Sequence, residues 1–268
     1  MKNRERQEQL AKNSAIAVVV LGDDERIVGE SKSRTSLDLP GYQLDLVKAI
    51  YETGTPIVVV LLNGRPMTIN WINKYVPAVV EAWFPGKWGG DAVADVLFGD
   101  YNPGGKLPVT FPKTIGQLPL DFPHKPGSHS GDVSSVDGVL YPFGHGLSYT
   151  EFSYSNLVIT PAEQKKDANI TVTLEVKNTG TRKGDEVVQL YTRQVTSSVT
   201  TFVKNLKGFK RISFEPGEVK TVSFELSPED LSIISRENKF TVEPGKFNVM
   251  IGSSSEDIRL NGSFIIKD

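Results

Sequence analysis

The chain contains no cysteine and only three histidines, and these scarcities exclude several kinds of site. Without cysteine the chain can form neither a disulfide nor a thiolate metal site. A zinc site would depend on His124, His129 and His145, whose positions do not follow the spacing of zinc ligands. We therefore expect no metal and no other cofactor.

The chain also lacks a charge imbalance and a long apolar run. Its 30 basic and 32 acidic residues give a net charge of −2, which gives no reason to expect nucleic acid or an anionic membrane as a partner. No apolar run approaches the roughly 20 residues that span a bilayer. Residues 1–10 are highly charged and lack the apolar core of a signal peptide. We expect a soluble chain without an export signal, and leave its compartment unknown.

Strand and helix patterns alternate over the first 98 residues. The apolar, β-branched run at 15–21 predicts a buried strand, and similar runs predict strands at 57–62 and 78–83. Helices are expected at 4–12, between Gly41 and Gly54, at 68–73 and at 91–98. Strands joined by helices favour a mainly parallel sheet with helices on both faces. The fold class expected here is a three-layer α/β sandwich.

A long polar loop, residues 22–40, follows the first of these strands. In open α/β sheets, ligands bind at the carboxyl ends of the strands. Residues 23–34 of the loop carry four carboxylates and three cations, a mixture that can separate the pKa of one carboxyl group from those of its neighbours. These residues are Asp23, Asp24, Glu25, Glu30, Arg26, Lys32 and Arg34. A merely solvated charged loop is the alternative interpretation, while the absence of a Gly-x-Gly-x-x-Gly turn argues against a dinucleotide site.

The second half of the chain changes pattern twice. Residues 99–149 are rich in proline and glycine, which indicates loops and short edge strands. Beyond residue 152 apolar and polar residues alternate in short runs separated by turn signals, which is typical of an antiparallel sandwich of the immunoglobulin or fibronectin type III kind. Strands are expected at 170–176, 187–191, 219–226, 239–242 and 246–251. We place an α/β domain at 1–120, a Pro/Gly-rich linker at 121–150 and a fibronectin type III-like domain at 151–268.

An ordered series of motifs resembles glycoside hydrolase family 3, the family of β-glucosidases and β-xylosidases, and covers nearly the whole chain. The motifs are Gly29-Glu30-x-x-x-Arg34, Pro56 to Pro66, Trp83-Phe84-Pro85-Gly86, Asp95 to Pro108, Tyr141 to Tyr149, Leu206 to Lys210, and Glu243 to Phe247. The series is closest to bacterial β-glucosidases of the periplasmic type. Full-length relatives of that type are often periplasmic or secreted.

The resemblance implies a place within a longer architecture. Members of the family typically have an N-terminal (β/α)8 barrel, then an α/β sandwich domain, and often a fibronectin-like domain. This sequence matches the second and third and shows no segment like the barrel, which in the family carries the Asp nucleophile and most sugar-binding residues. The partners implied are a β-glucoside or short β-glucan oligosaccharide and a barrel domain or chain that supplies the nucleophile.

The resemblance also implies roles for individual residues. Glu30 stands where the family has its general acid/base, in the loop after the strand, and Glu25 is the fallback because this loop varies. Arg34 and Trp88 are candidate sugar-binding residues, although for Trp88 we favour burial in the sandwich core or at a domain interface. A retaining hydrolase needs two carboxyl groups about 5–5.5 Å apart, so we expect this chain to be inactive alone.

Two rival functions remain at this stage. The chain could be a non-catalytic carbohydrate-binding module, in which case it would bind glucose or cellobiose by itself. It could also be a partner-complementing module, whose barrel-facing surface drives association through an exposed apolar patch. The interpretation we favour is the C-terminal part of a retaining β-glucosidase that hydrolyses terminal β-D-glucosyl residues.

Overall fold

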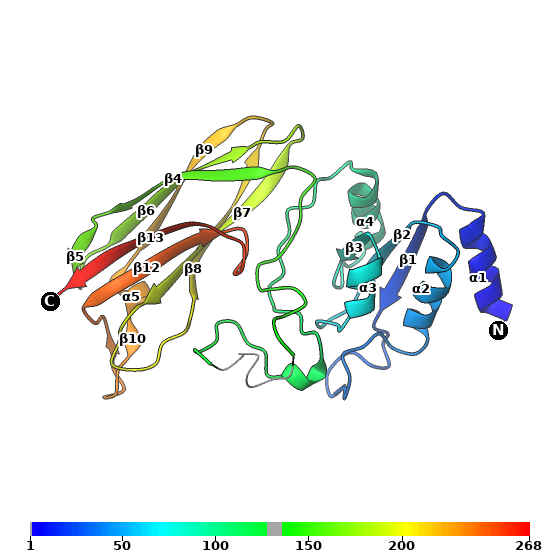
Figure 1. Cartoon of the computed structure of the whole chain (residues 1–268), viewed down its shortest axis with the longest axis horizontal. Coiled ribbons are helices and arrows are strands. Elements are labelled where there is room, and N and C mark those ends of the chain that lie inside the picture. The colour runs from blue at the N-terminus through cyan, green and yellow to red at the C-terminus, as the bar shows by residue number, and fades with distance from the viewer. Residues whose placement is uncertain (1, 128–135) are drawn as a thin grey trace. The chain divides into compact units, whose positions relative to one another are not determined.

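The computed structural model describes residues 2–127 and 136–268, with side chains described from residue 5 onward. The chain divides into two compact units (Figure 1). The first unit comprises residues 1–98 and 111–119, and the second comprises residues 99–110 and 120–268. None of the helices in the described ranges combines the length and apolar character that a membrane span requires.

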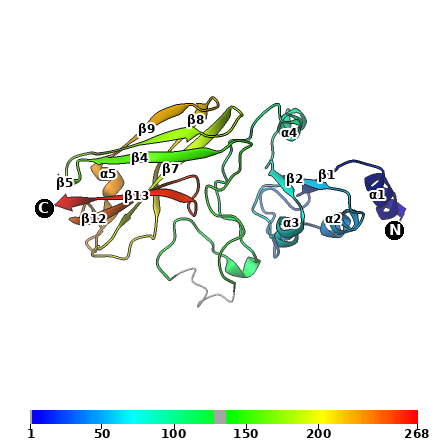
Figure 2. The same ribbon diagram turned by 45° about the horizontal axis from the view of Figure 1, so that its top comes forward.

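The first unit is an α/β sandwich around a parallel sheet. In its described part, strands β1 (Ala17–Gly22), β2 (Ile57–Leu62) and β3 (Ala78–Glu81) pair in the order β1-β2-β3. Helices α2 (Gln43–Tyr51) and α3 (Asn70–Tyr75) form the two crossovers and lie on one side of the sheet, while α4 (Gly89–Phe98) lies on the other side (Figure 2). Helix α1 (Lys2–Lys12) precedes β1. The expected three-layer arrangement is confirmed.

The expectation that the first strand is buried is wrong for one of its faces. Val19 and Leu21 are buried against the helices, but Val18 is 51% and Val20 57% exposed. The central strand β2 is different, because Val59, Val60 and Leu61 are all at most 1% exposed. The apolar run could not reveal this exposed face. A run of β-branched residues predicts a strand, but it does not show whether other elements cover both faces of that strand.

The second unit is a two-sheet, mainly antiparallel β-sandwich, as the alternating pattern predicted; the pairing of the short strand β5 with β13 is parallel. One sheet has the strand order β5-β13-β12-β7-β8 and the other β4-β6-β9. Their inner faces meet in a core of fully buried side chains such as Leu174, Val188 and Phe264. The bounds are β4 Phe152–Thr160, β5 Glu163–Lys165, β6 Ile170–Asn178, β7 Gly184–Gln194, β8 Asn205–Phe214, β9 Val219–Leu226, β12 Gly245–Gly252 and β13 Ile258–Lys267.

Short elements complete the chain. A capping box at Ser227 and Asp230 starts the short helix α5 (Pro228–Leu231). Strands β10 (Ile233–Ile234) and β11 (Phe240–Thr241) form a separate ribbon, so the strand expected at 239–242 belongs to neither main sheet. A short 3-10 helix, η1 (Ile115–Gln117), lies in the first unit.

The segment interpreted as a linker is partly built into the second unit. The backbone N–H of Leu107 donates to the carbonyl of His145 at 2.8 Å, and the N–H of Gly144 donates to the carbonyl of Leu107 at 2.8 Å. Phe122 stacks on Phe143 with ring centroids 4.4 Å apart. Residues 128–135, including His129, lie outside the described residues. The domain limits at 120 and 150 stay predictions.

Candidate functional site

The base of the Glu30 loop is fixed where β1 ends. Gly22 exchanges two hydrogen bonds with the side-chain amide of Gln43 at the start of α2, at 2.8 and 2.9 Å. Gly22 has φ of +139°, and a Cβ there would lie 1.9 Å from the carbonyl oxygen of Leu62. The chain therefore leaves the sheet in a backbone conformation and at a closeness to β2 that glycine permits.

A buried ion pair holds the two arms of the loop together. The guanidinium of Arg34 donates to Oδ1 of Asp23 at 2.9 Å, and the two side chains are only 12% and 0% exposed. The other guanidinium nitrogen donates to the carbonyl of Asp38 at 2.6 Å, and Oδ2 of Asp23 accepts from the N–H of Gly64 at 3.3 Å. Sequence patterns placed these charges in one loop but did not reveal that the two would pair.

Glu30 lies at the tip of a tight turn on this loop. The N–H of Lys32 donates to the carbonyl of Gly29 at 3.2 Å, which closes a turn with Glu30 and Ser31 at its centre. Ser31 has φ of 61°, the left-handed conformation that a type II turn requires at its third position. Glu30 is exposed. The turn therefore places Glu30 at the protein surface, beyond the carboxyl end of β1.

The other acidic residues of the loop are arranged differently. Arg26 forms a bidentate pair with Asp24, at 3.1 and 2.7 Å, and also donates its backbone N–H to Oδ1 of Asp24 at 2.8 Å. These bonds lower the pKa of Asp24. Glu25, the fallback candidate, is exposed on a separate turn, which the N–H of Ile27 closes by donating to the carbonyl of Asp24 at 3.1 Å. Asp23 and Asp24 thus form ion pairs within the loop, whereas Glu25 and Glu30 are the exposed carboxylates among residues 23–34.

The turn after β2 forms hydrogen bonds with the Glu30 loop. Asn63 is fully buried and donates its side-chain amide to the carbonyl of Arg65 at 2.8 Å. The guanidinium of Arg65 donates to the carbonyls of Ile27 and Lys32, each at 3.4 Å. Arg65 therefore spans the segment that bears Glu30 and contacts its backbone on both sides.

We predict that Arg65→Ala loosens this segment without unfolding the unit. Losing two long hydrogen bonds is expected to cost about 1 kcal/mol of local stability, or roughly a fivefold larger opening constant. Hydrogen exchange at the amides of Ile27 and Lys32 measures this change. Arg65→Lys is the control for charge and is expected to loosen the segment less than Arg65→Ala, because both bonds come from one nitrogen, Nη2, and a lysine ammonium also carries several donors on one nitrogen. Unchanged exchange in Arg65→Ala would contradict the support role.

Glu81 is an ionisable residue of this edge that the sequence interpretation passed over. It ends β3, and burial raises its pKa to about 7, although the N–H of Trp83 and the side chain of Asn63 donate to its carboxyl group. Nearby Asp23 raises that pKa further. The sequence feature that could have identified Glu81 is its position as the single carboxylate within the apolar run 78–83.

The candidate sugar-binding residues occupy different settings. Arg34 is engaged by Asp23 and by the carbonyl of Asp38, as described above. Trp88 is 68% exposed, with the Lys87 ammonium 4.8 Å from its ring centroid, so burial of this ring in the sandwich core is not observed, and burial at a domain interface stays a prediction. Contact of either residue with a sugar stays a prediction.

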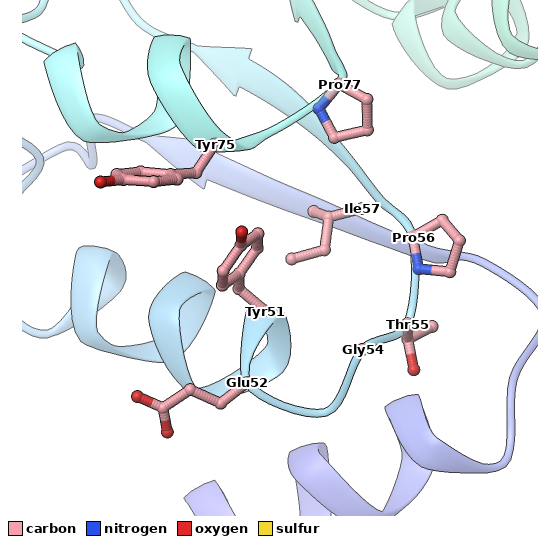
Figure 3. Close-up of a pocket in the computed structure, with 8 residues that line it drawn as sticks. All are labelled: Tyr51, Glu52, Gly54, Thr55, Pro56, Ile57, Tyr75 and Pro77. Atoms are coloured by element: carbon pink, nitrogen blue, oxygen red, sulfur yellow. The ribbon is translucent and has the colours of Figure 1, made fainter.

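Two surface pockets lie away from the Glu30 loop. One, of about 480 Å3, lies at the amino ends of β2 and β3, where Pro56 and Pro77 border it together with the rings of Tyr51 and Tyr75 (Figure 3). Because the Glu30 loop leaves the opposite, carboxyl ends of the strands, this pocket does not include it.

The other pocket, of about 510 Å3, belongs to the second unit. Two of the carboxylates that line it have partners within the unit, since Glu186 lies 3.7 Å from the Lys106 ammonium and Asp257 lies 2.8 Å from the Arg259 guanidinium. Across the described residues, no group of three or more His, Asp or Glu side chains is arranged to hold a metal ion.

Comparison with known proteins places the chain in a family. Residues 1–149 match the glycosyl hydrolase family 3 C-terminal domain, and residues 186–255 match a fibronectin type III-like domain. A β-xylosidase of Formosa agariphila is 47% identical over 250 residues, which cover 92% of this chain and 35% of the relative. A periplasmic β-glucosidase of Salmonella typhimurium is 43% identical over 267 residues, covering 96% of this chain and 35% of that protein.

Solved structures agree with the sequence comparison. A β-glucosidase of Erythrobacter marinus superposes with a TM-score of 0.92 at 36% identity, covering 99% of this chain and 36% of that one. A β-glucosidase of Listeria innocua in complex with glucose gives 0.92 at 32% identity, covering 100% and 38%. The chain thus spans between a third and two fifths of the length of these relatives. It belongs to glycoside hydrolase family 3 and corresponds to the family's C-terminal α/β domain followed by its fibronectin type III-like domain.

Proposed function

We propose that this chain supplies the general acid/base of a retaining β-glucosidase, and that Glu30 is that residue. The observation that carries the proposal is the position of Glu30 at the tip of a turn that a buried ion pair and Arg65 hold at the carboxyl edge of the sheet. Glu25 is exposed in the same loop and is the fallback. The nucleophile is proposed to come from a (β/α)8 barrel domain or chain that faces this edge.

The proposed reaction needs two carboxyl groups with different tasks. The barrel carboxylate attacks the anomeric carbon while Glu30 transfers its proton to the glycosidic oxygen, so the aglycone leaves as an alcohol. Glu30, now ionised, then takes a proton from water as that water displaces the nucleophile and releases the sugar. An acid keeps its proton near neutral pH when it is desolvated or lies beside another negative charge. Closure against a barrel supplies both conditions, and solvent around the isolated chain supplies neither.

The substrate class of this chain is part of the proposal. The relatives include both β-glucosidases and β-xylosidases, and terminal β-D-glucosyl residues are the substrate that we propose for this chain. A periplasmic location is supported only by the name of the Salmonella typhimurium relative.

The proposal is tested by measuring hydrolysis of aryl β-glucosides and aryl β-xylosides by this chain with and without a separately expressed barrel domain. Turnover that appears only with the barrel supports complementation. Calorimetry with glucose and cellobiose on the isolated chain tests the rival carbohydrate-binding module, for which binding without the barrel is expected. Vigorous hydrolysis by this chain alone would contradict the division of the two carboxyl groups.

A further inference from the structure

The last residue of β3, Glu81, forms hydrogen bonds with the segments that follow β2 and β3 in the first unit. Its Oε1 accepts a hydrogen bond from the backbone N–H of Trp83 at 3.0 Å, and its Oε2 accepts from the side-chain amide of Asn63 at 3.3 Å. Asn63 in turn bonds to the carbonyl of Arg65. One arm of the network therefore runs from Glu81 through Asn63 to the residue that spans the Glu30 segment.

The second arm begins at Trp83, whose backbone is in an unusual conformation. Its φ of 52° lies in the left-handed region, where a bulky aromatic residue is rare and strained. The hydrogen bond to Glu81 stabilises this conformation, and the Trp83 ring packs edge-on against Phe111 with centroids 5.9 Å apart. The left-handed residue turns the chain so that the next side chain, Phe84, points back toward the turn after β2.

Phe84 then contacts the loop that carries Glu30. A Cβ on Gly64 would lie 2.7 Å from Cε2 of Phe84 and 3.3 Å from Cγ2 of Val28, so both side chains pack on Gly64. Val28 lies two residues before Glu30 in the sequence. The N–H of Gly64 donates to Asp23, the buried partner of Arg34. The second arm therefore also ends on the Glu30 loop.

We propose that Glu81 is a positioning residue for Glu30, which holds the loop in place through Asn63 and Arg65 on one side and through Trp83 and Phe84 on the other. This inference rests on the proposed role of Glu30 in catalysis. Glu81 itself does not contact substrate in this assignment, because its carboxyl group is occupied by donors from its own unit.

The protonation of Glu81 provides a readout that a packing role alone would not give. Burial raises its pKa to about 7, so the carboxyl group is neutral well below pH 7 and ionised well above it. Oδ1 of Asn63 is buried without a hydrogen-bond partner among the described residues, and a protonated Glu81 carries a donor of the kind that this oxygen lacks. The other charged groups at this edge of the sheet are Asp23 after β1, its partner Arg34, and Arg65 in the turn after β2.

Glu81→Gln and Glu81→Ala test the assignment in the isolated chain. NMR signals of Val28 and Gly64 are expected to shift with a midpoint near pH 7 in the wild type and to lose that titration in Glu81→Gln. In Glu81→Ala, amide exchange at Ile27 and Lys32 is expected to be at least about tenfold faster, because two buried donors lose their acceptor. Glu52→Gln, a change at a carboxylate outside the network, is the control. Titration that persists in Glu81→Gln, or unchanged exchange in Glu81→Ala, would overturn the inference.

Phe84→Ala provides an independent variant in case Glu81→Ala fails to fold. It removes the packing contact but no buried acceptor, and it is expected to speed exchange at Ile27 and Lys32 while β2 amides stay protected. Phe98→Ala, at a phenylalanine of the same unit that is 84% exposed, is the matched control. Equal exchange in the two variants would contradict the second arm.

Kinetics in the barrel-completed enzyme separate this inference from the proposed function. Displacement of a catalytic group by about 1 Å can cost roughly a hundredfold in rate, so we expect kcat of Glu81→Ala to fall roughly tenfold or more while KM changes little. Glu81→Gln is expected to keep most of kcat and to alter its pH profile near pH 7. If the wild-type enzyme shows no turnover, the proposed function is refuted and the NMR result decides whether Glu81 positions the loop. If the wild type turns over and both variants have unchanged kinetics, only the positioning role is refuted.

Discussion

Glu30→Ala is expected to lower the turnover of poorly activated β-glucosides by a factor of roughly 10²–10⁴ in the enzyme completed by a barrel domain, the range that general acid/base catalysis contributes. The loss has a chemical cause, because a poor leaving group departs as an alcohol only when its oxygen is protonated. Aryl glucosides with strongly activated leaving groups need little protonation. For these substrates we expect a smaller loss in the first step and a slow second step, since no base remains to activate water.

Azide and the neighbouring glutamate make this prediction specific. Azide is a nucleophile that needs no general base, so it is expected to restore the slow step of Glu30→Ala and to yield a glucosyl azide, which can be detected by mass spectrometry. Glu25→Ala is the matched control, because Glu25 is an exposed carboxylate in the same loop. If Glu25→Ala shows the large loss and the azide rescue while Glu30→Ala does not, the acid/base is Glu25.

The sequence predicted the elements of this fold well where a single physical pattern dominates. The run 57–62 has no polar residue, and β2 is the buried central strand of the described sheet. The alternation at 170–176 likewise appears as β6, with every second side chain facing the sandwich core. Both patterns report burial directly, and burial is what determines these strands.

The sequence was less informative where partners distant in the chain decide the structure. Val18 belongs to an apolar run like that of β2 and yet is half-exposed, because nothing in the described structure covers that face of β1. Strand β8 contains five exposed or charged positions around Lys210 and Arg211 and gave no clear alternation. Its place in the sheet comes from pairing with β7, which a local pattern does not encode.

The candidate site shows the same division. Motif resemblance was enough to make Glu30 a candidate, because the spacing from Gly29 to Arg34 lies within one short segment. The pairing of Asp23 with Arg34, the reach of Arg65 to the loop and the contact of Phe84 with Gly64 depend on three strand ends meeting at one edge of a sheet. In our proposal these contacts hold Glu30 in place. They form only because the pairing of β1, β2 and β3 brings the three strand ends together.

Arg34→Ala is expected to destabilise the first unit by about 3–5 kcal/mol, the cost of leaving a buried carboxylate without its cationic partner. Asp23 is fully buried and would keep only its 3.3 Å bond from the N–H of Gly64. Tryptophan fluorescence during urea unfolding reports this unit selectively, because Trp71, Trp83 and Trp88 are the three tryptophans of the chain and all lie within it.

Two further variants test whether the Asp23–Arg34 ion pair contributes to stability because it is buried. Arg26→Ala breaks the Asp24 pair in the same loop, where the side chains are 83% and 40% exposed, and is expected to change stability little because solvent screens an exposed pair. Replacing Asp23 and Arg34 together by alanine removes the stranded charge, so the double variant is expected to be more stable than Arg34→Ala alone. If Arg34→Ala costs no more than Arg26→Ala, the buried pair does not hold the loop, and the position of Glu30 must depend on Arg65 and Phe84 instead.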